Sequence, residues 1–176
     1  GRTSTVFLAE ENGTFFLRTN GLPEAYIPRK GAPPSRHNQS WLTALPALAR
    51  PQAESMMIIG LGGGLSVTAA PPTLNDIDVV ELEPKVVEAN RVIAGLRESD
   101  PLSDPRVNII TNDARNALAL TDKTYDIIVA QPSHPWTSGA SHLYTREFMA
   151  EAKAHLKKDG VYLQWINASF IGEGLV

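Results

Sequence analysis

A continuous apolar run followed at once by a glycine-rich turn is the feature that most restricts the fold of this chain. Met56–Ile59 is apolar throughout, and four of the next five residues are glycine: Gly60, Gly62, Gly63 and Gly64. An apolar run that ends in glycine is typical of a buried parallel strand that leads into a helix. Glycines at such a turn permit positive φ angles and let a ligand approach the backbone closely. The segment predicts a ligand-binding turn in an α/β sheet.

Apolar strands and helices alternate through the rest of the chain. We expect further strands at Ile77–Leu82, Val107–Thr111, Tyr125–Ala130 and Val161–Ile166, and helices over Leu65–Ala70, Pro84–Leu96, Ala114–Leu120 and Thr145–Leu156. Such alternation implies right-handed crossovers and a parallel sheet with helices on both faces. A turn at Lys158-Asp159-Gly160 is expected to precede the last strand. The pattern predicts a Rossmann-like α/β fold.

The first fifty residues follow a different pattern. Thr5–Glu10 and Thr14–Thr19 are β-prone runs around an Asn-Gly turn, which is a hairpin signal, and a second Asn-Gly pair follows them. Ser40–Arg50 suits a short amphipathic helix that is interrupted near Pro46. These residues predict a small β-rich cap with one helix.

We therefore expect two units, an N-terminal β-hairpin cap over residues 1–36 and a Rossmann-like cofactor-binding domain over residues 37–176. A length of 176 residues is enough to bury a core without a metal or a disulfide. The absence of cysteine excludes a disulfide framework, a thiolate nucleophile and a cysteine-based zinc site. His37, His142 and His155 lack ligand spacing, so no metal site is expected. A net charge of −3 argues against a broad nucleic-acid-binding surface.

The ends of the chain suggest a piece of something longer. The sequence begins at Gly1 without an initiator methionine or a signal-peptide pattern, and it stops at Val176 without a natural tail. No apolar run approaches the ~18 residues that a membrane span requires. We expect a C-terminally truncated, cytoplasmic segment, and we leave open that it is the cytoplasmic domain of a membrane protein.

Acidic residues stand at the ends of the second and third expected strands. Glu81 follows the glycine turn by about 20 residues, the position from which a carboxylate accepts hydrogen bonds from ribose hydroxyls. Asp113 follows the third strand and reaches the same edge of the sheet. Two alternatives stay open, because Glu81 also suits a solvated loop and Asp113 also suits the N-cap of the next helix.

The fourth expected strand leads into a loop rich in Pro, Ser and Gly, from Gln131 to Gly139. Loops at this edge of a sheet often carry catalytic groups. His134 suits a general base because its ordinary pKa lies near neutrality. The alternative is a histidine that packs on Trp136 or faces water.

The glycine turn fits neither of two common nucleotide-binding patterns. It reads G-x-G-G-G and lacks the third glycine spacing of a nicotinamide fingerprint, and no P-loop Lys-Ser/Thr follows it. Neither a dinucleotide nor a nucleoside triphosphate is therefore expected at this turn.

Taken together, the motifs resemble the spermidine/spermine synthase family, and most closely its bacterial spermidine synthase-like branch. The segments that carry the resemblance are Ile-Gly-Leu-Gly-Gly-Gly, Val-Val-Glu-Leu-Glu-Pro, Asp-Pro-Arg-Val, Asn-Asp-Ala-Arg, Tyr-Asp-Ile-Ile-Val-Ala-Gln-Pro-Ser-His-Pro-Trp and Leu-Tyr-Thr-Arg-Glu-Phe. The resemblance covers nearly the whole chain. It implies a class I methyltransferase-like fold with a small N-terminal β domain, and S-adenosylmethionine or decarboxylated S-adenosylmethionine as cofactor, with methylthioadenosine as product.

The resemblance also assigns cofactor-binding residues. The family's glycine turn, which binds the aminopropyl region, corresponds to Gly60, Gly62, Gly63 and Gly64. The acid that holds the ribose corresponds to Glu81, and the acid that reads the adenine corresponds to Asp113, which Ala114 follows. A glutamine near the first helix that contacts the cofactor corresponds to Gln39.

The departures from the family fall where the reaction would occur. Gln131 replaces the aspartate taken as the base that deprotonates the attacking amine, and His134 replaces a second aspartate that helps bind the diamine. The glycine turn also lacks the family's aspartate. A neutral glutamine cannot accept the proton, and a buried diammonium without carboxylates is costly.

The sequence therefore favours a spermidine synthase-like transferase that moves an alkyl group, such as an aminopropyl group, to a small-molecule amine, with His134 as the nearest base. Two alternatives remain: a non-catalytic adenosyl-ligand-binding module of a larger protein, and a small-molecule methyltransferase. A homodimer and a membrane domain elsewhere in the full-length protein are left open.

Overall fold

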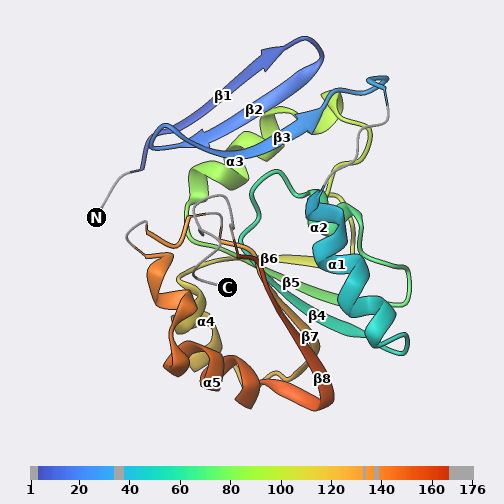
Figure 1. The fold of residues 1–176 in the computed structure, drawn as a ribbon. Coiled ribbons are helices and arrows are strands. Elements are labelled where there is room, and N and C mark those ends of the chain that lie inside the picture. Colours follow the sequence, from blue (N-terminus) through green and yellow to red (C-terminus); the bar gives the residue numbers. More distant parts are fainter. Residues whose placement is uncertain (1–3, 34–37, 133, 137–138, 167–176) are drawn as a thin grey trace, which may run out of the picture.

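The computed structural model describes residues 4–33, 38–132, 134–136 and 139–166, which form two sheets (Figure 1). The first is antiparallel and joins β1 (Val6–Glu11), β2 (Thr14–Thr19) and β3 (Leu22–Pro28). The second is parallel, in the order β6-β5-β4-β7-β8, with β4 (Ser55–Ile59), β5 (Asp76–Glu81), β6 (Val107–Thr111), β7 (Tyr125–Ala130) and β8 (Leu156–Gln164). The predicted α/β class with a parallel sheet is thereby confirmed.

Helices cover both faces of the parallel sheet. They are α1 (Asn38–Ala49), α2 (Leu65–Thr68), α3 (Pro84–Val92), α4 (Ala114–Ala119) and α5 (Arg146–Ala154), with short 3₁₀ turns η1 (Ala94–Leu96) and η2 (Ser141–Tyr144). Met56 and Ile58 of β4 pack into a core shared with α1, α2, α3 and the N-terminal sheet. Met57 and Ile59 face the opposite side, in a core shared with α4 and α5. The alternation along β4 explains why its whole run is apolar.

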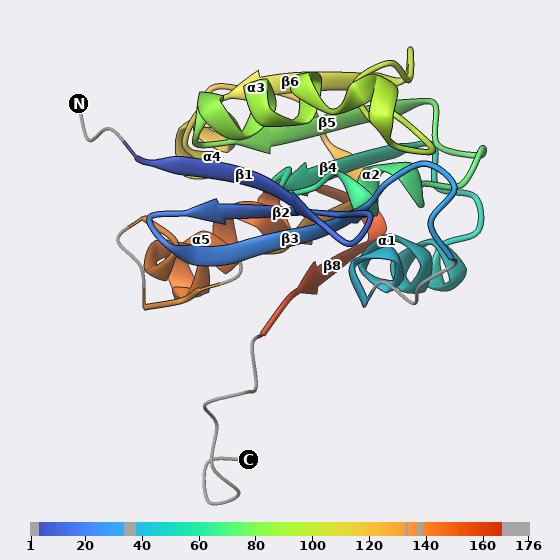
Figure 2. The same cartoon turned by 90° about the horizontal axis from the view of Figure 1, so that it is seen from above.

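The N-terminal sheet lies over the carboxyl edge of the parallel sheet (Figures 1 and 2). The predicted hairpin is confirmed, and both of its Asn-Gly pairs have positive φ at Asn and Gly, as tight two-residue hairpin turns require. The second turn leads into β3, a strand that the sequence analysis did not assign and that extends to Pro28.

Several sequence-based boundaries were wrong. The helix expected over Pro84–Leu96 ends at Val92 and is followed by η1, and two larger differences concern Pro46 and the last strand. The helix expected to break near Pro46 continues through it, because Leu42, Thr43 and Pro46 are buried against the sheet and α2, and Thr43 Oγ1 donates to the carbonyl of Ser66 at 2.7 Å. Tertiary packing here outweighs the helix-breaking effect of proline.

The second error concerns the last strand. The expected turn at residues 158–160 lies inside β8, where Asp159 has a φ of 61° and the pairing with β7 shifts register between Tyr125 and Ile127. These residues form a bulge within a strand that starts earlier than predicted.

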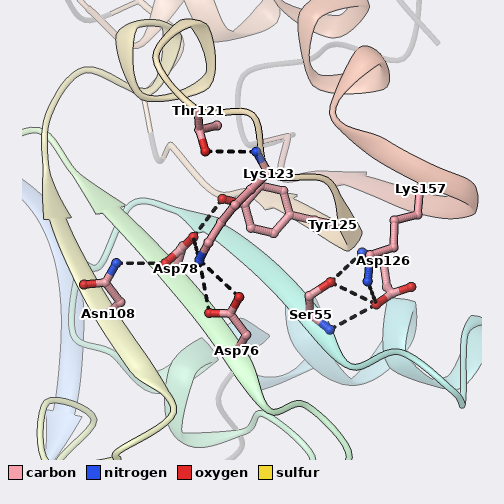
Figure 3. A network of polar contacts seen from close by, with 9 residues as sticks. All are labelled: Ser55, Asp76, Asp78, Asn108, Thr121, Lys123, Tyr125, Asp126 and Lys157. Carbon is pink, nitrogen blue, oxygen red and sulfur yellow. Dashed lines mark hydrogen bonds and ion pairs between the residues drawn. The ribbon is translucent and has the colours of Figure 1, made fainter.

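Two carboxylates anchor the amino ends of the strands, at the edge opposite the N-terminal sheet (Figure 3). Buried Asp78 accepts hydrogen bonds from the Tyr125 hydroxyl at 2.7 Å and from Lys123 Nζ at 2.9 Å. Asp126 Oδ2 accepts from the Ser55 amide and hydroxyl and from Lys157 Nζ, at 2.9–3.0 Å. The first network links β5 to β7 across β4, and the second links β7 to its neighbours β4 and β8. Both leave the carboxyl edge to the cavity described next.

Candidate functional site

A cavity of ≈ 440 Å³ lies between the N-terminal sheet and the carboxyl edge of the parallel sheet. Its volume falls in the range of roughly 300–1,000 Å³ that is typical of small-molecule sites. The ends of β4, β5, β6 and β7 contribute to its wall, together with α1 and the strand β3. The predicted site residues that line it are Gln39, Gly60, Gly62, Gly63, Glu81, Asp113, Ala114, Gln131 and His134. Gly64 does not line it.

The glycine turn between β4 and α2 is packed too tightly to accept a side chain at two positions. A Cβ atom at Gly63 would lie 2.6 Å from Ile27 Cγ1 and 2.8 Å from Ala25 Cβ, both on β3. A Cβ atom at Gly64 would lie 2.4 Å from Pro101 Cγ, and Gly64 also has a φ of 72°. The N-terminal sheet therefore fills the space next to Gly63 with apolar side chains.

Glu81, at the end of β5, is 8% exposed and is oriented by backbone amides. Its Oε2 accepts a hydrogen bond from the Leu61 amide at 2.8 Å, and its Oε1 accepts one from the Glu83 amide at 2.9 Å. Burial raises the pKa of this carboxyl, although the backbone amides partly offset the effect. The amides of Gly62 and Leu82 add to those of Leu61 and Glu83 in stabilising the ionised form. The geometry rules out the solvated-loop alternative for this residue.

Asp113 combines two roles at the start of α4. Its Oδ1 accepts from the Arg115 amide at 2.9 Å, which caps the helix, and its Oδ2 pairs with Arg115 Nη2 at 2.7 Å. Hydrogen bonding from the Arg115 side chain is the main reason that the pKa of Asp113 is lowered. The residue is thus an N-cap as well as part of the cavity wall. Ala114, directly after it, is buried.

Gln131, at the end of β7, bridges two segments of the cavity floor. Its Nε2 donates to the Gly60 carbonyl at 2.6 Å, and its Oε1 accepts from the Ser66 hydroxyl at 2.6 Å. Ser66 Oγ also lies 3.0 Å from the carbonyl of Gln39 at the start of α1. The amide group therefore needs both its donor and its acceptor to hold the glycine turn, α2 and β7 together.

His134 is buried against the N-terminal sheet. Its Nε2 lies 3.0 Å from the carbonyl of Pro23, and its ring centroid lies 5.3 Å from that of Trp136. A carbonyl can only accept a hydrogen bond, so Nε2 carries the hydrogen and Nδ1 is the basic nitrogen of the neutral ring. The packing on Trp136 matches the alternative that the sequence left open.

Sequence reasoning missed several residues that shape the cavity. Asn90 and Arg97 hold the carbonyls of the glycine turn, and the strand β3 supplies a wall of the cavity. A signal for Asn90 was present, because it is a polar residue on the apolar face of α3, one turn after Val86. No comparable sequence signal marks Arg97.

In the part of the chain that the structure describes, no three His, Asp or Glu side chains gather in a way that would hold a metal ion. No helix in those ranges is long and apolar enough to cross a membrane.

Comparison with known proteins gives concordant results. A family profile described as a spermine/spermidine synthase domain matches residues 36–174. A polyamine aminopropyltransferase of Clostridium perfringens is 28% identical over 163 residues, which cover 89% of this chain and 53% of the relative. The polyamine aminopropyltransferase 2 of Aquifex aeolicus is 27% identical over 132 residues, which cover 73% of this chain and 27% of the relative. The chain thus spans about half or less of the length of these relatives.

Solved structures show the same fold at lower identity. The spermidine synthase of Thermotoga maritima has a TM-score of 0.75 at 19% identity, over 99% of this chain and 58% of that one. A spermidine synthase in complex with the transition state analogue AdoDATO has a TM-score of 0.73 at 19% identity, over 89% of this chain and 56% of that one. This likeness confirms the expected Rossmann-like, methyltransferase-type fold.

Proposed function

The chain belongs to the spermine/spermidine synthase family, and from this premise we propose that it binds decarboxylated S-adenosylmethionine in the cavity and transfers its aminopropyl group to a small amine. The observation that carries the proposal is the buried, amide-oriented carboxylate of Glu81 at the end of β5, beside the glycine turn. A carboxylate in that position of a Rossmann-like sheet suits the hydroxyls of a ribose.

Further features of the cavity support the nucleoside half of the proposal. The carboxylate of Asp113 stands at the next strand end, where it suits the exocyclic amine of an adenine. The glycine turn offers backbone to the tail of the ligand. A spermidine synthase of the same fold has been crystallised with the analogue AdoDATO. Together these features favour an adenosyl compound over a dinucleotide.

The proposed reaction is a displacement at carbon. The amine nitrogen forms a bond to the aminopropyl carbon attached to sulfur, the C–S bond breaks, and its electron pair stays on sulfur to give methylthioadenosine. The amine loses one proton, for which we propose His134, a residue of the cavity wall, as the base. Orientation of the two reactants supplies much of the acceleration, since a sulfonium is already a good leaving group.

The acceptor half of the cavity differs from that expected for a diamine. Gln131 is neutral, and its donor and acceptor both serve internal hydrogen bonds. His134 bonds to the backbone of the N-terminal sheet. Neither group offsets the desolvation of an ammonium. The carboxylate of Glu24 on β3 also lines the cavity and can balance one ammonium, so we propose an acceptor with a single amine in preference to putrescine.

An assay of methylthioadenosine release tests the proposal. Decarboxylated S-adenosylmethionine is supplied with monoamines and, separately, with putrescine, cadaverine or spermidine. We expect release with a monoamine and little with putrescine. Binding without release to any amine would leave a non-catalytic module, and methyl transfer from S-adenosylmethionine would indicate a methyltransferase. Failure of all adenosyl compounds to bind would overturn the proposal as a whole.

A further inference from the structure

The backbone of the glycine turn is held from the side of α3 by two side chains. Asn90 Nδ2 donates to the carbonyl of Gly62 at 2.8 Å, and Arg97 Nη2 donates to the carbonyl of Gly63 at 2.8 Å. The two side chains are joined to each other, since Arg97 Nη1 donates to Asn90 Oδ1 at 2.9 Å. Consecutive carbonyls of the turn are therefore fixed by one connected pair of side chains.

Both side chains are buried to an extent that is unusual for their chemistry. Asn90 is 0% exposed and Arg97 is 5% exposed. Burial lowers the pKa of the Arg97 guanidinium, which a nearby acid, Asp100, partly opposes. Among the described residues, no carboxylate forms an ion pair with Arg97. Its charged guanidinium instead donates to two neutral oxygens, Asn90 Oδ1 and the Gly63 carbonyl. Burial of a charge without an opposite charge beside it costs free energy. The hydrogen bonds to Asn90 and the Gly63 carbonyl must offset this cost.

The same segment is tied to the N-terminal sheet. The backbone of Arg97 pairs with that of Arg29, and the Lys30 amide donates to the Leu96 carbonyl at 2.8 Å. On the other side of the turn, Ile27 of β3 packs within contact distance of Gly63. The glycine turn is thus enclosed between β3 and the Asn90–Arg97 pair.

Because peptide units are planar, the bonds to the glycine turn also fix the direction of its N–H groups. In a trans peptide the N–H points opposite to the carbonyl of the same unit. Since Asn90 binds the Gly62 carbonyl, the Gly63 N–H is directed away from α3. The pair therefore determines which polar groups the turn offers to the cavity that Gly62 and Gly63 line.

We propose that Asn90 and Arg97 are positioning residues, which hold the glycine turn in the conformation that receives the tail of the adenosyl ligand. The proposal rests on the proposed function, because it assigns a tail to that ligand. It requires the bidentate reach of a guanidinium, which joins Gly63 to Asn90. A lysine at position 97 keeps the charge but cannot maintain both bonds in this geometry.

The test compares two ligands that share a nucleoside and differ in the tail. Affinities for methylthioadenosine and decarboxylated S-adenosylmethionine are measured calorimetrically with the wild type, Arg97→Lys and the matched control Arg91→Lys, which changes an exposed arginine on α3. We expect Arg97→Lys to weaken binding of the decarboxylated compound about 10-fold or more, with less than about a 3-fold change for methylthioadenosine. The control is expected to change neither affinity.

Equal losses for both ligands, or no loss for either, would overturn the proposal and leave the proposed function intact. Failure of the wild type to bind either ligand would overturn both. A second measurement follows hydrogen exchange of the Gly64 amide, which donates to the Leu61 carbonyl within the turn at 2.8 Å. Without ligand, we expect this amide to exchange slowly in the wild type and at least about 10-fold faster in Arg97→Lys, whereas equal exchange in the two proteins contradicts the proposal.

Discussion

The carboxylate of Glu81 lies 2.8 Å from the amide nitrogen of Leu61, so the acid that ends β5 is bonded directly to the turn that follows β4. The Glu83 amide holds the second carboxylate oxygen. A buried carboxylate oriented in this way needs no reorganisation to accept further hydrogen bonds. The two adjacent strand ends therefore act as one preorganised acceptor at the wall of the cavity.

Replacing this acid tests the acceptor role. In Glu81→Gln, the NH₂ group would face a backbone N–H, so two donors would meet. The single remaining oxygen would offer fewer acceptor positions to a ribose. We expect methylthioadenosine binding to weaken by about 1–3 kcal/mol, measured by calorimetry. The control is Glu88→Gln on the exposed face of α3. An unchanged affinity in Glu81→Gln would remove this residue from the site.

The raised pKa of Glu81 also predicts a pH dependence of binding. Ribose hydroxyls donate to the ionised carboxylate, and burial favours its protonated form. Affinity for methylthioadenosine should therefore be highest above the pKa of Glu81 and fall as the pH is lowered through it. The decline should begin at a higher pH than an ordinary carboxyl would give. Affinity that rises on acidification would contradict this account.

Gln131 supplies a third prediction. In Gln131→Glu, a carboxylate oxygen would face the Gly60 carbonyl in place of the donating Nε2. The pKa of the new carboxyl should be raised in the folded state, so its ionisation destabilises the protein at pH values above the unfolded pKa. We expect a loss of about 1–3 kcal/mol in the free energy of unfolding at neutral pH, which diminishes in acid. A variant as stable as the wild type at neutral pH would show that the bridge is dispensable.

Asp126 predicts how the stability of the fold depends on pH. Desolvation alone would raise its pKa, but hydrogen bonds from Lys157 and from the Glu54 and Ser55 amides lower it to about 2. The depressed pKa contributes stability above the ordinary value of 3.8 that is lost as the pH falls toward about 2. The contribution should be about 2 kcal/mol at neutral pH.

Urea unfolding at several pH values measures this contribution. Asp126→Asn should flatten the acid limb of the curve of unfolding free energy against pH, whereas Asp122→Asn, at an exposed position, should leave it unchanged. An acid limb of equal slope in Asp126→Asn would assign the effect to other groups.

Gly63→Ala tests the contact between the glycine turn and the N-terminal sheet. Its Cβ would lie 2.6 Å from buried Ile27, so we expect destabilisation of about 1–3 kcal/mol through overpacking. Gly95→Ala is the control, because a Cβ there meets nothing within 4 Å. Equal midpoints of urea unfolding for the two variants would show that β3 yields easily.

Much of this structure could be predicted from local sequence patterns. The apolar run of β4, the glycine turn after it and Glu81 about 20 residues later predicted a strand, a turn and an acid at one edge, since the carboxyl ends of parallel strands meet there. The Asn-Gly pairs predicted the hairpin turns because both residues adopt positive φ there. These features depend on residues close together in sequence.

Features that depend on contacts between distant residues could not be predicted from the sequence. α1 passes through Pro46 because its buried face packs on α2, and β8 absorbs Asp159 as a bulge because β7 pairs with residues on both sides of it. The bond from Arg97 to Gly63 joins residues 34 positions apart and follows no periodicity. The closure of the cavity by β3 likewise depends on how the two sheets pack.

A crystal structure of the protein with methylthioadenosine tests the central claim most directly. We predict that the nucleoside lies in the cavity beneath the N-terminal sheet, with both ribose hydroxyls within hydrogen-bond distance of the Glu81 carboxylate and the adenine beside Asp113. A nucleoside bound elsewhere, or a ribose that makes no contact with Glu81, would contradict the account.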